Sequence, residues 1–240
     1  MVITLEALLI SKDAGLLGVL RPTLEKLSVS VEVCSALQTG GEMLRKRKFD
    51  AVIVDCDDLQ GGVELLTSLR NSQSNGSSVA FAVLNGATTT QEAFKIGANF
   101  VLQKPLTPLN ANRCFNAALN FMVRERRRYF RHPVEMTIRM SLPDGTDVNA
   151  TTTNVSEGGM AIRLEGKLPK NVIARVQFTL PESNLSLEVK GNIAWADGAG
   201  NAGIKFVELP QSSQYQLEKW LTDRLKNELP VDLQSHLSPR

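Results

Sequence analysis

Cysteine, histidine and aromatic residues are scarce in this 240-residue chain, which has three cysteines, two histidines and 5% aromatic residues. The cysteines (Cys34, Cys56 and Cys114) lie far apart, and no CxxC motif or His/Cys cluster connects them. An odd number of scattered cysteines argues against a disulfide framework, and the missing cluster argues against a zinc site. We expect buried thiols in a reducing compartment.

Long apolar runs and a large net charge are also missing. No apolar run approaches the roughly 20 residues that a membrane span needs, and the N-terminal segment lacks the basic region of a secretory signal peptide. A net charge of +2 gives no general reason to expect binding to DNA. We therefore expect a cytoplasmic protein with no membrane span and no DNA partner.

Signatures of catalysis are missing too. No nucleophile–base pair, cluster of metal ligands or glycine-rich phosphate loop stands out. We therefore expect no enzymatic activity, no catalytic residue, no metal site and no cofactor. The sequence does have an ordinary globular composition, 42% hydrophobic and 22% charged, and enough length for two small domains.

The first half alternates short apolar runs with segments of helical periodicity. The predicted strands cover residues 5–10, 29–34, 51–54, 79–84 and 100–102, and the predicted helices lie near residues 16–27, 40–48, 63–70 and 91–96 and from 107 onward. Five strands alternating with five helices predict a doubly wound, parallel, five-stranded α/β sheet of the flavodoxin-like kind. In such sheets the functional residues follow the C-terminal ends of the strands.

The second half has shorter elements whose side chains alternate between apolar and polar. Strands are predicted at residues 134–142, 147–155, 160–164, 173–180, 185–196 and 203–206, with turn residues between them. Closely spaced strands of this kind predict a small antiparallel β-barrel. The apolar stripe of Leu217, Trp220, Leu221 and Leu225 predicts a C-terminal helix that closes it.

A dense basic run joins the two halves. Five arginines fall within eight residues: Arg124, Arg126, Arg127, Arg128 and Arg131. Three interpretations are open at this point: a solvated helix face, a patch for nucleic acid or an acidic membrane, and a site for a phosphorylated small molecule. Arginine suits the third because its planar guanidinium binds phosphate with two hydrogen bonds and also stacks on bases.

Two short motifs separate these interpretations. Arg127 and Arg131 form an RxxxR motif, and residues 154–159, NVSEGG, form an NxSxxG motif between two predicted strands. In this order the motifs resemble those of the PilZ domain, the bacterial receptor module for cyclic di-GMP. The resemblance covers about residues 124–227, where GNIAWAD and GIKFVEL are similar to later strands of that family. It implies cyclic di-GMP as the ligand.

The chemistry of these residues agrees with the resemblance. The guanidinium groups of Arg127 and Arg131, on an arm expected to be non-helical, can bind a phosphate and the acceptor edge of guanine. Asn154 and Ser156 are two apart, so in a strand they point to the same side. Gly159 permits a close approach or a positive φ.

Other residues near these motifs have simpler assignments. Arg126 or Arg128 is expected to add a second ligand contact. Trp195 is expected to be a core or edge residue of its strand. Taken alone, the NVSEGG segment is also compatible with a plain turn.

The first half resembles the receiver domain of bacterial response regulators over roughly residues 4–122. FDAVIVD ends at Asp55, where that family has its phosphoacceptor, and GANFVLQKP places Lys104 at the lysine of its final strand. The family also needs an acidic pair after the first strand to hold a divalent ion. This chain has Ser11 and Lys12 there, while Asp13 comes one position late and is better explained as a helix N-cap.

Further departures predict that this receiver is degenerate. Leu84-Asn85 ends the fourth strand where the family has Ser or Thr, and Val101 replaces its switch aromatic. Lys12 is expected to pair with Asp55 in place of a metal ion. Asp57 and Asp58 add carboxylates nearby, which leaves weak metal binding open. We therefore predict a structural scaffold in which Asp55 is not a working phosphoacceptor.

The sequence thus predicts a degenerate receiver-like domain (1–122), a basic arginine linker (123–133), a PilZ β-barrel domain with its closing helix (134–228) and a flexible tail (229–240). The predicted function is that of a cyclic di-GMP effector in which ligand binding reorients the domains and changes contacts with a downstream protein. A homodimer through the receiver-like domain is compatible with this function. The alternatives are a response regulator phosphorylated on Asp55 and a ligand-free interaction scaffold.

Overall fold

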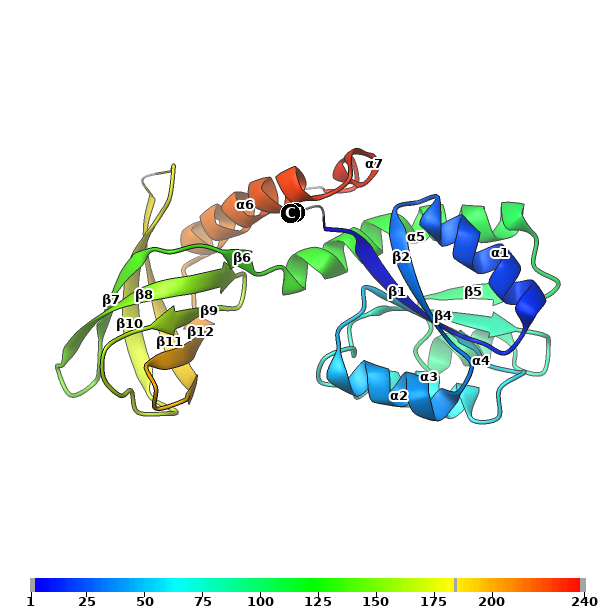
Figure 1. Ribbon diagram of the computed structural model, residues 1–240, viewed down its shortest axis with the longest axis horizontal. Coiled ribbons are helices and arrows are strands. Elements are labelled where there is room, and N and C mark those ends of the chain that lie inside the picture. The colour runs from blue at the N-terminus through cyan, green and yellow to red at the C-terminus, as the bar shows by residue number, and fades with distance from the viewer. Residues whose placement is uncertain (1–2, 184, 238–240) are drawn as a thin grey trace. The chain divides into compact units, whose positions relative to one another are not determined.

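The structure, a computed structural model, describes residues 3–183 and 185–237 and is shown in Figure 1. It divides into two compact units. The first contains the described residues up to Arg126 and those from Glu228 onward, and the second runs from Arg127 to Asn227. The chain therefore passes from one unit to the other twice.

The first unit is a five-stranded sheet with strand order β2-β1-β3-β4-β5 and parallel pairing throughout. The strands are β1 (Leu5–Ile10), β2 (Val29–Cys34), β3 (Ala51–Asp55), β4 (Val79–Leu84) and β5 (Phe100–Gln103). The helices are α1 (Ala14–Glu25), α2 (Leu37–Lys46), α3 (Gly62–Arg70), α4 (Thr90–Lys95) and α5 (Pro108–Tyr129). The predicted doubly wound parallel sheet is confirmed.

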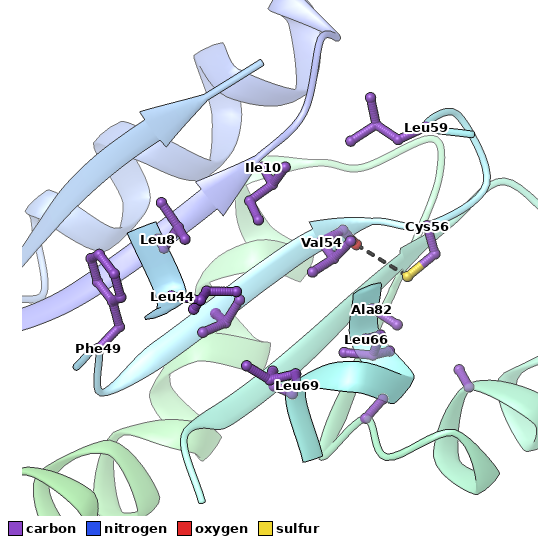
Figure 2. Close-up of a cluster of buried hydrophobic side chains, with 14 of the residues drawn as sticks. Leu8, Ile10, Leu44, Phe49, Val54, Cys56, Leu59, Leu66, Leu69 and Ala82 are labelled. Carbon is purple, nitrogen blue, oxygen red and sulfur yellow. Dashed lines mark hydrogen bonds between the residues drawn. The ribbon is translucent and has the colours of Figure 1, made fainter. Parts of the chain in front are cut away.

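Apolar side chains on both faces of this sheet form its core. Every residue of β3 and β4 is buried, as expected of central parallel strands covered by helices on both sides. Figure 2 shows one face, where Leu8 and Val54 of the sheet belong to the same buried cluster as Leu44 of α2 and Leu66 of α3. Two buried sheet faces hold the ends of the strands in fixed positions.

The second unit has seven strands, and six of them form a closed antiparallel barrel. The strands of this unit are β6 (His132–Pro133), β7 (Thr137–Ser141), β8 (Asp147–Ser156), β9 (Gly159–Arg163), β10 (Ile173–Leu180), β11 (Leu185–Ala196) and β12 (Asn201–Glu208). Their order is β6-β8-β7-β10-β11-β12-β9, and pairing of β8 with β9 closes the barrel. The short β6 pairs with β8 beyond the end of β7. The predicted barrel is confirmed.

The closing helix α6 (Gln211–Glu228) buries the predicted stripe of apolar residues. Trp220 anchors it, because its indole Nε1 donates a hydrogen bond to the carbonyl of Pro181 at 3.0 Å. The edge of the His132 ring also packs against Trp220, with the ring centroids 5.3 Å apart. Through the His132 contact, α6 packs against β6, the strand that follows the basic segment.

The strand predicted at residues 134–142 is shorter in the structure, where it is β7 (Thr137–Ser141), and the two-residue β6 (His132–Pro133) precedes it. Between them, the hydroxyl of Thr152 donates to the carbonyl of Val134 at 2.6 Å and accepts from the amide of Met136 at 3.0 Å. The Thr152 side chain therefore adds to the backbone hydrogen bonds at this point, next to a bulge in β8. The sequence pattern did not reveal this interruption, because its apolar alternation continues through it.

The basic segment differs from the predicted non-helical arm. Helix α5 continues to Tyr129, so four of the five arginines are helical and Arg131 alone follows the helix. Two ion pairs to the first unit hold the extension, from Glu125 to Lys48 and from Arg126 to Asp50. Arginine and glutamate are good helix formers, and the first breaker in the run is Pro133.

The predicted flexible tail contains a short helix, α7 (Val231–Gln234). Leu229 and Leu233 are buried, and the amide of Ile3 donates to the carbonyl of Glu228 at 2.8 Å. The two buried leucines belong to a segment that packs within the first unit. Residues 238–240 of the predicted tail lie outside the described residues. None of the helices in the described chain is long and apolar enough to cross a membrane.

Candidate functional site

Strand pairing brings the two sequence motifs of the second unit together. In the antiparallel pair of β6 and β8, His132 lies opposite Val155 and Pro133 lies opposite Asn154. One step further along this register, Arg131 comes alongside Ser156. The second arginine of RxxxR therefore lies beside the NxSxxG segment, although 25 residues separate Arg131 from Ser156 in the sequence.

The two motif arginines have different surroundings. Arg131 is exposed just after α5, with its guanidinium available to solvent. Arg127 is in the last turn of α5 and only 3% exposed. Its Nε lies 3.0 Å from a carboxylate oxygen of Glu157, inside the NxSxxG segment. The carboxylate of Glu157 therefore holds Arg127 at the turn, in the position that an anionic ligand group could take.

The polar residues of NxSxxG lie on one side of β8. Asn154 and Ser156 are separated by one residue, with no bulge between them, so their side chains share a face as predicted. The Ser156 hydroxyl is buried and donates to the carbonyl of Gly159 at 3.0 Å. The side-chain oxygen of Asn154 is buried and has no hydrogen-bond partner among the described residues. An acceptor of this kind suits a ligand donor.

Glycine is required at position 159 because two strands approach each other closely there. Its φ is not positive, and its close approach is to strand β12, where an added Cβ would lie 2.2 Å from the carbonyl oxygen of Ile204. Gly158 differs, because an added Cβ there would meet nothing within 4 Å. Gly159 therefore permits the close approach of β9 to β12 beside the site.

The sequence predicts a second ligand contact from Arg126 or Arg128. The structure commits Arg126 to the first unit, where its Nη2 lies 2.8 Å from the Asp50 carboxylate and donates to the carbonyl of Thr4. Burial raises the pKa of Asp50 to about 6, and Arg126 opposes this rise. Arg128 is exposed near the end of α5. Arg126 is therefore an anchor of the helix and does not belong to the site.

The first unit gathers a second polar group at the C-terminal ends of its strands. Asp55 ends β3 and is 1% exposed, and one carboxylate oxygen accepts a hydrogen bond from Ser11 Oγ at 2.7 Å. The same oxygen lies 3.1 Å from the ammonium of Lys104, which follows β5. The predicted pairing of Asp55 with Lys12 is wrong, because Lys12 is exposed and Lys104 supplies the cation.

The comparisons with known families agree with both halves of this description. Residues 7–112 match the response regulator receiver domain, and residues 125–223 match the PilZ domain. The chain contains a receiver domain and a PilZ domain. Both families are regulatory and non-enzymatic. No curated protein matches the chain.

Solved structures resemble each domain at low sequence identity. The chemotaxis response regulator CheY4 of Vibrio cholerae is 18% identical, with 48% of this chain and 98% of that chain covered and a TM-score of 0.44. The PilZ domain of CeSA from a cellulose-synthesizing bacterium is 18% identical, with 40% and 97% covered and a TM-score of 0.34. The Bacillus subtilis inhibitor of motility MotI/DgrA is 18% identical, with 43% and 53% covered and a TM-score of 0.38.

The receiver domain gathers carboxylates, but Ser11 and Lys12 stand where its family has the acidic pair for a divalent ion. Asp13, Asp55 and Asp58 bring oxygen atoms within 4.8 Å of one another. The ammonium of Lys104 contacts all three. Burial opposes its charge, but hydrogen bonds to Asp58, Asp55 and Asp13 outweigh burial and raise the pKa of Lys104. The lysine cation therefore offsets part of the negative charge of the three carboxylates.

Asp13, within the cluster, and Asp57, beside it, also accept hydrogen bonds from backbone amides. Asp13 is the N-cap of α1, as predicted, and hydrogen bonds from the Leu16 amide and from Lys104 lower its pKa. Asp57 accepts from the amides of Asn85 and Thr88 rather than joining the cluster. The backbone contacts of Asp13 and Asp57 thus give each of these acids a structural role.

Two residues of these sites, Glu157 and Ser11, were not predicted from the sequence. Glu157, in a variable position of NxSxxG, carries the charge that meets Arg127; its proximity to an arginine motif was the available signal. Ser11 contacts Asp55 by a hydrogen bond, which requires no charge and so left no charge pattern to detect.

Proposed function

We propose that this protein is a bacterial cyclic di-GMP effector and that the ligand binds the PilZ domain along β8, between Arg131 and the NxSxxG segment. The register of β6 and β8 supports the proposal most directly, because it brings Arg131 alongside Ser156 from a separate part of the chain. Arginine donates to the acceptor edge of guanine, and the unpaired oxygen of Asn154 accepts from the amino groups of guanine.

Binding at this site exchanges one anion for another. A phosphate of the ligand replaces the Glu157 carboxylate beside Arg127, which keeps the buried guanidinium paired throughout. Arg127 directly follows Arg126, which is held by Asp50 in the receiver domain. Reorganisation at Arg127 therefore acts on the helix that enters the receiver domain, and a downstream protein recognises the altered orientation of the domains.

The receiver domain acts in this proposal as a scaffold for a partner protein or a second copy of the chain. Its support is a set of large apolar side chains exposed on α4 and α5: Phe94, Leu109 and Phe121. Sedimentation of the parent protein and of Phe121→Ser tests self-association. A dimeric parent with a monomeric variant supports the homodimer, whereas a monomeric parent at all concentrations leaves the partner protein as the occupant.

A thermal-shift series tests the ligand site. Cyclic di-GMP stabilises the protein if it binds the folded state in preference to the unfolded chain. We expect the parent and Arg175→Ala to gain in melting temperature, and Arg131→Ala and Asn154→Ala to gain little or nothing. Arg175 is the matched control because it is an exposed arginine on β10 of the same barrel. An equal gain in Arg131→Ala and Arg175→Ala would place the ligand elsewhere.

A further inference from the structure

The chain contains two Asn-Gly dipeptides, Asn75-Gly76 and Asn85-Gly86, and both lie in loops of the receiver domain. Asparagine is a chemically labile residue. When glycine follows it, the backbone nitrogen of the glycine can attack the side-chain carbonyl carbon, since glycine has no Cβ to obstruct the approach. Because the dipeptide is the same in both places, its surroundings decide which copy reacts.

The first dipeptide is closed to this reaction. The Asn75 side chain is fully buried; its Nδ2 donates to the carbonyl of Leu44 at 2.7 Å, and its Oδ1 accepts from the amide of Phe49 at 2.9 Å. The amide of Gly76 donates to the carbonyl of Ser72 at 2.9 Å. The side chain is therefore held away from the attacking nitrogen, and that nitrogen is already engaged in a hydrogen bond.

The second dipeptide is open. Asn85 and Gly86 are both exposed, in the loop between β4 and α4. The φ of Gly86 is 108°, and a Cβ added to this residue would meet nothing within 4 Å. Among the described residues, no backbone carbonyl accepts a hydrogen bond from the Gly86 amide. Water therefore reaches both the asparagine and the nitrogen that attacks it.

The side chain of Asn85 is already folded over the next peptide group. Its Oδ1 accepts a hydrogen bond from the amide of Ala87 at 3.1 Å, which closes an Asx turn around Gly86. This contact keeps Cγ beside the Gly86 nitrogen and polarises the carbonyl group that the nitrogen attacks. The amides of Asn85 and Thr88 donate to Asp57 at 2.7 and 3.2 Å, which holds the loop in this conformation.

We propose that Asn85 is a site of spontaneous deamidation, which adds a negative charge to the receiver domain. The Gly86 nitrogen loses its proton to hydroxide and forms a bond to Cγ of Asn85. The bond between Cγ and Nδ2 then breaks, and Nδ2 takes a proton from water and leaves as ammonia. Water opens the resulting cyclic imide at either carbonyl, which gives aspartate or isoaspartate at position 85. This inference is independent of the ligand site in the PilZ domain.

The new carboxylate lies beside the acidic cluster of the receiver domain. Nδ2 of Asn85 donates to an oxygen of Asp58 at 2.7 Å, and Asp58 contacts the Lys104 ammonium. Deamidation replaces this donor with a like charge. The number of acidic side chains rises from 25 to 26 against 27 basic ones, so the net charge falls from +2 to +1. The domain thereby gains negative charge close to Asp55 without a phosphodonor.

Ageing of the full chain tests the proposal. The purified protein is incubated for several weeks at mildly alkaline pH, which supplies the hydroxide, and its charge variants are then separated. Both dipeptides fall in one tryptic peptide, residues 71–95, so fragmentation of that peptide in a mass spectrometer compares them directly. We expect a more acidic species that is modified at Asn85 and unmodified at Asn75. Asn85→Gln should accumulate little of it, because the longer side chain would have to close a six-membered ring.

The same chain unfolded in guanidinium chloride is the control for the chemistry. Unfolding removes the contacts of Asn75, so both dipeptides should be modified there at similar rates. Modification of Asn85 alone in the folded protein, with both modified in the unfolded chain, supports the proposal. Two results overturn it: an unmodified Asn85 in the folded protein over the period in which the unfolded chain reacts at both sites, or equal modification of Asn75 and Asn85 in the folded protein.

Discussion

Arg126 lies 2.8 Å from the buried carboxylate of Asp50, whereas the next residue, Arg127, lies 3.0 Å from Glu157. The first ion pair belongs to the receiver domain and the second to the PilZ domain. Two adjacent residues of one helix are therefore held by different domains. A ligand that shifts the backbone at Arg127 therefore acts directly on the residue that Asp50 holds.

Arg126→Ala is expected to destabilise the receiver domain. The substitution leaves Asp50 buried without its cation, a loss of about 3 kcal/mol in the free energy of unfolding near neutral pH. Arg124→Ala is the matched control, because Arg124 is exposed one position before Glu125. Denaturant unfolding of the two variants should show a large effect for Arg126 and an effect within about 0.5 kcal/mol for Arg124.

The cost of Arg126→Ala should depend on pH. The pKa of Asp50 is raised to about 6, so its contribution to stability is complete below the unfolded value of about 4 and is lost as the pH rises through about 6. Removing Arg126 raises the pKa of Asp50 further, which makes the variant lose more stability above pH 6. Unfolding at pH 5 and pH 8 should therefore give a smaller penalty at pH 5. An equal penalty at both would show that the ion pair is not its cause.

Glu157→Gln is expected to tighten ligand binding while lowering stability. The carboxylate competes with the ligand for Arg127, and glutamine keeps the shape of the side chain without its charge. We expect affinity to rise several-fold and the melting temperature of the unliganded protein to fall, because a buried arginine loses its counter-charge. Titration and thermal unfolding of the same sample measure both effects. A weaker affinity would mean that Glu157 positions Arg127 for the ligand.

Gly159→Ala and Gly158→Ala form a matched pair one residue apart. Alanine at position 159 places a Cβ 2.2 Å from the Ile204 carbonyl, whereas alanine at position 158 meets nothing within 4 Å. We expect Gly159→Ala to destabilise the barrel by about 2–4 kcal/mol and Gly158→Ala to be close to neutral. Thermal unfolding compares them. Equal stabilities would show that β9 and β12 can separate at no cost.

Asp55 is expected to remain unphosphorylated. The acidic pair that holds the divalent ion in the receiver family is missing, since Ser11 and Lys12 stand in its place, and the Lys104 ammonium already contacts Asp13, Asp55 and Asp58. Incubation with a small phosphodonor and magnesium, followed by intact mass measurement, should show no added phosphoryl group. A phosphorylated parent with an unmodified Asp55→Asn variant would instead support the response-regulator alternative.

Much of the fold could be predicted from periodicity alone. Apolar runs placed the central strands β1, β3 and β4, because strands buried on both faces consist almost wholly of apolar residues. The alternation in β10, buried at every second residue, likewise marked the barrel. Interruptions were not predictable. The break between β6 and β7 depends on the hydroxyl of Thr152, which a strand pattern tolerates without a signal.

The candidate site was predictable in its motifs and less so in its surroundings. RxxxR and NxSxxG identified Arg131, Asn154 and Ser156 by their spacing. Ion pairs between residues far apart in the sequence could not be predicted. Arg126 and Asp50, for example, are 76 positions apart and meet only in the folded chain. The exposure of Trp195 depends on which strand lies beside it, and a lone tryptophan in a strand carries no signal of that.

Isothermal titration of the full chain with cyclic di-GMP, with Arg131→Ala measured in parallel, tests the central claim most directly. The account predicts saturable binding by the parent and binding that is lost or strongly weakened in Arg131→Ala, because this exposed arginine lies alongside Ser156 at the proposed site. No heat of binding from the folded parent at high ligand concentration would contradict it, as would equal affinities of parent and variant.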